Sequence, residues 1–184
     1  MINVAIIEDS KDTIELLSII INMSANLKLV GTAGNGAEGI RMIDNTQPDV
    51  AIIDLGLPDM SGLECISALK KTCPETEFIV YTISTENEDV FEAFARGATS
   101  YILKHSQPKE IVDAIVEVHN GGSPITSSIA RKICNKFMLD SQKPSIDDAK
   151  KKYHITGKEE ELLRLLSNGL LYKEIAGKMN ISVK

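Results

Sequence analysis

The sequence predicts an α/β protein with a doubly wound, five-stranded parallel sheet, followed by a small, purely helical segment. Two observations lead to this fold class. Through about residue 120, short apolar runs alternate five times with amphipathic helical stretches. Beyond residue 152, amphipathic stretches recur without strands between them. Strict alternation of strand and helix is typical of a parallel sheet with helices on both faces.

The predicted strands are apolar runs bounded by polar or turn-forming residues. Ile2 to Ile7 is almost continuously apolar, as expected of a strand buried on both faces. The other four strands are predicted at 27–33, 50–53, 78–82 and 101–103.

Helices are predicted after each strand from apolar residues at helical spacing. Ser10 is placed to cap the first helix, Ser61 opens the third, and Pro108 begins the fifth. The second and fourth helices are predicted over about 37–44 and 90–98.

The chain changes character after residue 122. A helix is predicted over 125–138, with Ile129, Ile133 and Phe137 on one face, and a polar linker over 139–152. Thr156 and Glu159 then form a capping box that opens a leucine-rich helix, and a short second helix is predicted over about 172–179. We therefore expect three parts, at 1–122, 123–152 and 153–184.

Composition excludes several classes of protein. With 20 Lys and Arg against 26 Asp and Glu, the whole molecule is not expected to bind polyanions nonspecifically. The 3 cysteines lack metal-ligand spacing and are expected to be core or boundary residues in a reducing compartment. No apolar run approaches the roughly 20 residues of a membrane span, and the N-terminus has no signal-peptide pattern. We expect a soluble, cytoplasmic protein.

Polar residues with chemical potential follow four of the strands. Glu8 and Asp9, Asp54, Thr82 and Lys104 all stand at carboxyl ends, the edge where doubly wound sheets bind ligands. Three carboxylates in one crevice repel, so at least one pKa should rise unless a cation enters. Oxygen ligands suit Mg²⁺, and an ammonium and a hydroxyl can stabilise the oxygens of a transferring phosphoryl group. Taken singly, each group is equally well explained as a polar strand terminus.

These residues, with the stretch from Asp54 to Gly62, resemble the receiver-domain signature of two-component response regulators, a flavodoxin-like fold. The resemblance spans residues 1 to about 122 and implies a signalling protein rather than an enzyme. It implies that Asp54 accepts a phosphoryl group from a sensor histidine kinase. It also implies that Mg²⁺ is bound by three carboxylates and one backbone carbonyl, and that three further residues contact the phosphoryl group or switch conformation. The metal ligands would be Glu8, Asp9, Asp54 and the carbonyl of Gly56, and the other three residues Lys104, Thr82 and Tyr101.

One of these residues has a second interpretation, and two neighbouring residues depart from the family pattern. Tyr101 is also compatible with an ordinary strand aromatic. Ile83 stands after Thr82, where the family usually has a small residue, and we expect it to restrict access to the site. His105 follows Lys104, where the family often has proline, frequently after a cis bond; a cis bond before His105 would cost roughly 2.5–4 kcal/mol.

Residues 153–184 resemble the start of a LuxR-type helix-turn-helix domain. In this class the helix after the equivalent of Ser182 enters the major groove of DNA. Only Val183 and Lys184 follow here, so the recognition helix is expected to be absent and the chain not to read DNA sequence. Lys184 is a weak candidate for a phosphate contact, and Leu171 departs from the usual Ser or Thr cap. The resemblance rests on residues 155–159, 162–163, 169, 173–176, 179 and 181–182.

Three alternative functions are compatible with this sequence. The first is a phosphorylation-controlled transcription regulator whose longer parent binds DNA, with homodimerisation left open. The second is a regulator that signals by protein contact alone. The third is a phosphatase of the haloacid-dehalogenase type, which generally needs a second Asp where this chain has Gly56. Because two helices bury little surface, Leu162, Leu166 and Ile175 are expected to be partly exposed, or to pack on the first domain or a second copy.

Overall fold

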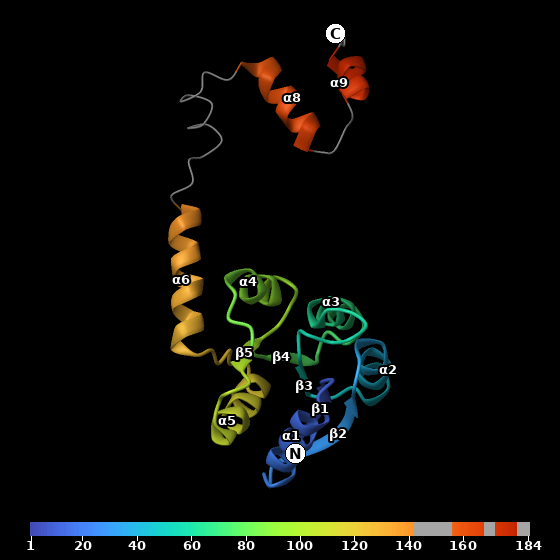
Figure 1. Ribbon diagram of the computed structural model, residues 1–184, viewed down its shortest axis with the longest axis vertical. Coiled ribbons are helices and arrows are strands. Elements are labelled where there is room, and N and C mark those ends of the chain that lie inside the picture. The colour runs from blue at the N-terminus through green and yellow to red at the C-terminus, as the bar shows by residue number, and fades with distance from the viewer. Residues whose placement is uncertain (142–155, 168–171, 180–184) are drawn as a thin grey trace. The chain divides into compact units, whose positions relative to one another are not determined.

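The computed structural model describes residues 1–141, 156–167 and 172–179. The chain divides into two units, Met1–Lys136 and Phe137–Lys184. The first unit contains a five-stranded parallel sheet in the order β2-β1-β3-β4-β5 (Figure 1). The strands are β1 (Ile2–Ile7), β2 (Leu27–Ala33), β3 (Val50–Ile53), β4 (Glu77–Thr82) and β5 (Ser100–Leu103). This confirms the predicted fold class, and the observed strands start within one residue of their predicted positions.

Helices cover both faces of the sheet, as expected of a doubly wound fold (Figure 1). One face packs against α1 (Lys11–Asn22) and α5 (Pro108–His119). The other packs against α2 (Gly36–Thr46), α3 (Gly62–Thr72) and α4 (Asn87–Ala95). Ser10 caps α1 by accepting the Thr13 N–H, as the sequence predicts.

The register of the sheet brings the strand ends together. Ile7 of β1 lies beside Ile53 of β3, and Thr82 of β4 lies beside Leu103 of β5. The residues that follow these positions therefore meet at one edge of the sheet, where β1 and β3 are direct neighbours.

Helix α4 differs from the prediction, since it starts and ends three residues earlier than 90–98. Gly97 has φ +104°, the left-handed conformation that ends many helices. The Ala98 N–H donates to the Ala93 carbonyl (3.0 Å) and the Gly97 N–H to the Phe94 carbonyl (3.1 Å). These are the two hydrogen bonds of a Schellman motif, so the helix terminates before Gly97.

Helix α6 (Ser127–Ser141) extends three residues beyond its predicted end, so residues 139–141 are helix rather than linker. Two residues of the predicted apolar face pack against the core: Ile129 is buried and Ile133 is half-buried. Phe137 is 69% exposed. The rest of the predicted linker, 142–152, lies outside the described residues.

The second unit contains α8 (Gly157–Ser167) and α9 (Tyr172–Met179). Its predicted capping box is confirmed: the Thr156 N–H donates to Glu159 Oε2 (2.8 Å) and the Glu159 N–H to Thr156 Oγ1 (3.4 Å). Leu162 and Leu166 are half-buried, as expected. Ile175 is buried, so partial exposure does not hold for it. The predictions for Gly169, Leu171 and 180–184 lie outside the described residues.

The cysteines and the lengths of the helices were also predicted from the sequence. Cys65 and Cys73 are buried and Cys134 is exposed, in line with core and boundary positions. Among the residues that the structure describes, none of the helices is long and apolar enough to cross a bilayer.

Candidate functional site

Three carboxylates meet at the carboxyl edge of the sheet. Glu8 and Asp9 follow β1, and Asp54 follows β3 directly. One ligand oxygen from each lies within 4.8 Å of the other two. Glu8 and Asp54 are buried, whereas Asp9 is exposed. The predicted cluster of three carboxylates is therefore present, with two carboxylates buried and one exposed to solvent.

Lys104 connects the two buried carboxylates. Its Nζ lies 2.7 Å from Glu8 Oε2 and 3.0 Å from Asp54 Oδ2. The backbone of Lys104 is held as well, because its N–H donates to the Thr82 carbonyl (2.9 Å) and its carbonyl accepts from the Tyr81 hydroxyl (3.4 Å). Tyr81 is a supporting residue that the sequence did not single out, because an aromatic in a buried strand carries no separate signal.

The pKa values of Glu8 and Lys104 follow from their burial and from the ion pairs that Lys104 forms with Glu8 and Asp54. Burial raises the pKa of Glu8 by disfavouring its charge, and the neighbouring Asp54 raises it further, against the hydrogen bonds from Lys104 and Ser10. For Lys104, burial acts to lower the pKa, but the hydrogen bonds to Glu8 and Asp54 outweigh it and the net pKa is raised. The expectation that one carboxylate pKa rises is met at Glu8, mainly through desolvation.

The residues present fit a magnesium ion. Apart from their contacts to Lys104, Glu8 Oε1 accepts the Ser10 N–H (3.1 Å) and Asp54 Oδ1 accepts the Leu55 N–H (2.8 Å). Asp9 adds an exposed carboxylate to the same cluster. Gly56 lies next to the cluster, since a Cβ built on it would be 3.6 Å from Asp54 Oδ2. Hard carboxylate and carbonyl oxygens with access to water are the ligands that Mg²⁺ prefers.

The loop after Asp54 is anchored at both its centre and its end. Asp59 accepts the Gly36 N–H at Oδ1 (2.8 Å) and the Ala37 N–H at Oδ2 (2.9 Å), both at the start of α2. A Cβ on Gly62 would lie 2.0 Å from the Asp54 carbonyl oxygen, so only glycine permits this close approach. This role of Asp59 was not predictable from local sequence patterns, because its partners lie 22 and 23 residues earlier in the chain.

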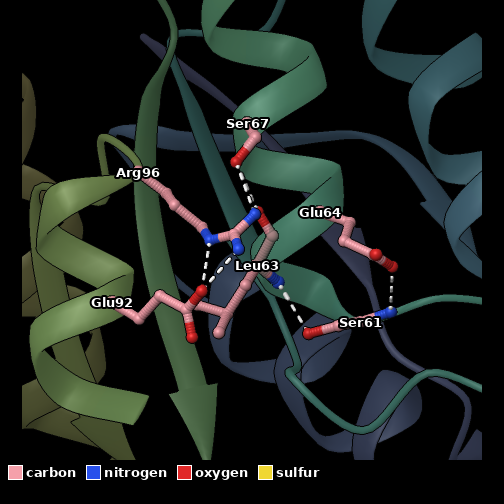
Figure 2. A network of polar contacts seen from close by, with 6 residues as sticks. All are labelled: Ser61, Leu63, Glu64, Ser67, Glu92 and Arg96. Carbon is pink, nitrogen blue, oxygen red and sulfur yellow. Dashed lines mark hydrogen bonds and ion pairs between the residues drawn. The ribbon is translucent and has the colours of Figure 1, made fainter. Parts of the chain in front are cut away.

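Polar contacts continue this anchoring into α3 and α4, as Figure 2 shows. Ser61 and Glu64 form a capping box at the start of α3: the Leu63 N–H donates to Ser61 Oγ (3.2 Å) and the Ser61 N–H to Glu64 Oε2 (3.1 Å). At the end of α4, the Arg96 guanidinium pairs with Glu92 and donates to Ser67 Oγ of α3 (3.1 Å). The C-terminal end of α4 is thus attached to α3.

The predicted switch residues lie next to this centre. Thr82 Oγ1 accepts the Ser84 N–H (3.3 Å), and the buried Tyr101 donates its hydroxyl proton to the Ser84 carbonyl (3.0 Å). Burial raises the pKa of Tyr101 to about 12, so the hydroxyl keeps its proton at neutral pH. Tyr101 therefore binds the segment that follows Thr82, a contact that a plain core aromatic would not need. Its role as a switch stays a prediction.

Ile83 and His105, the two residues that depart from the family pattern, are both exposed. The side chain of Ile83 is 82% exposed, so most of it faces solvent. Its effect on access to Asp54 stays a prediction. His105 is exposed, and there are no cis peptide bonds among the described residues. Lys104 reaches both carboxylates with a trans bond after it.

Comparison with known proteins agrees with this geometry. Residues 4–116 match the family model of the response regulator receiver domain. The oxygen regulatory protein NreC of Staphylococcus epidermidis is 31% identical over 91% of this chain and 78% of its own length. The nitrate/nitrite response regulator NarL of Escherichia coli is 28% identical over 89% of this chain and 74% of its own.

Solved structures support the same assignment. The signal receiver domain of NarL from Mycobacterium tuberculosis is 28% identical, with a TM-score of 0.63, over 65% of this chain and 97% of that domain. A LuxR-family response regulator from Aurantimonas shares the fold, with a TM-score of 0.71 and 24% identity over 75% of this chain and 99% of its own. The chain therefore belongs to the response regulators, and residues 4–116 are its receiver domain.

Proposed function

We propose that Asp54 accepts a phosphoryl group from a sensor histidine kinase and that this modification controls the chain's output. The observation that carries the proposal is the Asp54 carboxylate, which lies 3.0 Å from a lysine ammonium and within 4.8 Å of two further carboxylates. An acidic nucleophile, a fixed cation and a divalent-metal ligand set are the groups that phosphoryl transfer to a carboxylate requires.

In the proposed reaction an oxygen of Asp54 attacks phosphorus, and the bond from phosphorus to the donor breaks with its electron pair leaving on the donor. Lys104 holds the carboxylate and is in place to neutralise a phosphoryl oxygen. Glu8, Asp9, Asp54 and the Gly56 carbonyl would hold Mg²⁺, which when bound supplies positive charge to the phosphoryl oxygens. Thr82 and Tyr101 would respond to the new charge.

The partners of the chain are proposed from the family. Response regulators such as NreC and NarL are relatives over more than two thirds of their length. By likeness, we expect a sensor histidine kinase as phosphodonor, and DNA as the target of a LuxR-type domain to which α8 and α9 would belong.

The alternative of a phosphatase has less support. That chemistry generally uses a second carboxylate two residues after the nucleophile, and Gly56 offers none at this position. Without this acid/base group the aspartyl phosphate should persist, as a signal requires.

The proposal is tested by the intact mass of the protein after incubation with acetyl phosphate and Mg²⁺. The parent chain should gain one phosphoryl group, and Asp54→Asn should gain none. Chelation of the metal should abolish the gain. A gain that persists in Asp54→Asn would contradict the proposal, as would no gain in the parent with both acetyl phosphate and a phosphorylated sensor kinase.

A further inference from the structure

The segment before α6 covers the free edge of the sheet. Ser100 Oγ donates to the Pro124 carbonyl (2.6 Å), and Ile125 forms a parallel bridge with Tyr101. Ser123 Oγ also donates to the Thr99 carbonyl. Exposed edge strands usually need such protection. The chain that leaves α5 therefore continues along β5 before it enters α6.

Helix α6 then packs on the face formed by β5 and α4. Ile129 is fully buried in the cluster that contains Tyr101, Val90 and Ala93, and Ile133 packs against the same cluster. The Lys136 ammonium lies 5.7 Å from the centre of the Phe91 ring, within the range of a cation–π contact. This first part of α6 belongs to the same compact unit as the sheet.

One contact ties α6 to the segment between β4 and α4. Lys132 Nζ donates to the Thr85 carbonyl, and Tyr101 donates to the carbonyl immediately before it, that of Ser84. The N–H of Ser84 donates in turn to Thr82 Oγ1. Residues 82–85 are thus held from three sides, by the Thr82 hydroxyl, by Tyr101 and by α6.

We propose that the β5–α4 face is the docking surface of the chain's own helix α6, and that Lys132 and Tyr101 couple this docking to phosphorylation of Asp54. The inference rests on the proposed phosphoacceptor function. A phosphoryl group on Asp54 offers oxygens to the hydroxyl hydrogen of Thr82, while Thr82 Oγ1 continues to accept from Ser84. Fixing Thr82 fixes residues 82–85, which present the carbonyl that Lys132 binds. Phosphorylation and docking therefore favour each other, because coupling between two sites is reciprocal.

The test is hydrogen exchange of residues 127–136, measured by mass spectrometry on the full chain with Mg²⁺ alone and with Mg²⁺ plus beryllofluoride. Beryllofluoride should slow exchange in this stretch by at least about fivefold, the lower end of typical coupling. In Lys132→Gln the slowing should be largely lost. Arg131→Gln removes the same charge from an exposed neighbour on α6 and should behave like the parent.

Loading of the site is followed in the same samples by fluorine NMR of the bound beryllofluoride. Bound beryllofluoride with unchanged or faster exchange in 127–136 would overturn the coupling and leave the phosphoacceptor function intact. The proposed coupling would also be contradicted if beryllofluoride slowed hydrogen exchange of residues 127–136 in Lys132→Gln as much as in the parent. Absence of bound beryllofluoride would overturn both proposals.

Discussion

Lys104 compensates two buried negative charges, and its own side chain is only 20% exposed. Glu8 Oε2 has this ammonium at 2.7 Å as its partner. Removing the partner of a buried carboxylate lowers stability by several kcal/mol, because the remaining buried charge has neither a partner nor water to compensate it. The residue proposed to contact the phosphoryl group thus also contributes to the stability of the resting fold.

Replacing Lys104 by Met should lower the free energy of unfolding by about 3 kcal/mol at neutral pH without Mg²⁺. Urea denaturation measures this change. The double variant Lys104→Met, Glu8→Gln should recover part of the loss, since one of the two unpaired buried charges, that of Glu8, is gone. If the single variant unfolded at the same urea concentration as the parent, the ion pairs of Lys104 would not contribute to the stability of the fold.

Asp59 gives the receiver domain a pH-dependent contact. The backbone N–H groups of Ala37 and Gly36 hold the pKa of this exposed carboxyl below its usual range. A lowered pKa means that the ionised form favours the fold, so the contribution is present above the ordinary Asp pKa of about 3.9 and is lost as pH falls through the lowered pKa.

In Asp59→Asn we therefore expect reduced stability at neutral pH, with the difference from the parent shrinking as the solution becomes acidic below about pH 4. Thermal unfolding across a pH series measures it. Asp113→Asn is the matched control, because it removes the same charge from an exposed position on α5. A difference between Asp59→Asn and the parent that stayed constant down to pH 2 would contradict the assignment.

At the scale of elements, the turn from β3 into α3 depends on close backbone packing. The Gly62 N–H donates to the Leu55 carbonyl (3.0 Å), and the Cα of Gly62 faces the backbone of Asp54 and Leu55. A methyl group there meets backbone atoms rather than the end of a flexible side chain, so the loop carrying Asp54 would have to move.

Gly62→Ala should cost about 1–3 kcal/mol of stability, the usual range for overpacking, and should weaken Mg²⁺ binding in isothermal titration calorimetry. Gly34→Ala is the control, since a Cβ at that position meets nothing within 4 Å. Equal Mg²⁺ affinity in both variants would show that the Asp54 loop tolerates the displacement.

The elements themselves were largely predictable, for a physical reason. A strand buried on both faces needs an almost unbroken apolar run, and β1 and β3 begin and end where such runs do. Helix α4 was displaced in the prediction because its end depends on the left-handed conformation of Gly97, and a single glycine in a helical pattern leaves that open. The docking of α6 on β5 and α4 was also missed, since an apolar face does not identify its partner.

The residues of the candidate site could be predicted because the fold brings the ends of its strands together. The parallel fold requires that Glu8, Asp54 and Lys104 meet, and each is adjacent to a recognisable strand. The Asp59 contact to α2 and the Lys132 contact to Thr85 join segments 22 and 47 residues apart. Contacts of this kind depend on how helices pack, which local patterns do not specify.

We propose that Asp54, and none of the neighbouring carboxylates, carries the phosphoryl group. The most direct measurement is reduction of the acetyl phosphate-treated protein with sodium borohydride, which converts an aspartyl phosphate to homoserine, followed by peptide sequencing in the mass spectrometer. We predict homoserine at position 54 and unmodified aspartate at positions 9 and 59. Homoserine at Asp9 or Asp59, with Asp54 intact, would contradict the account.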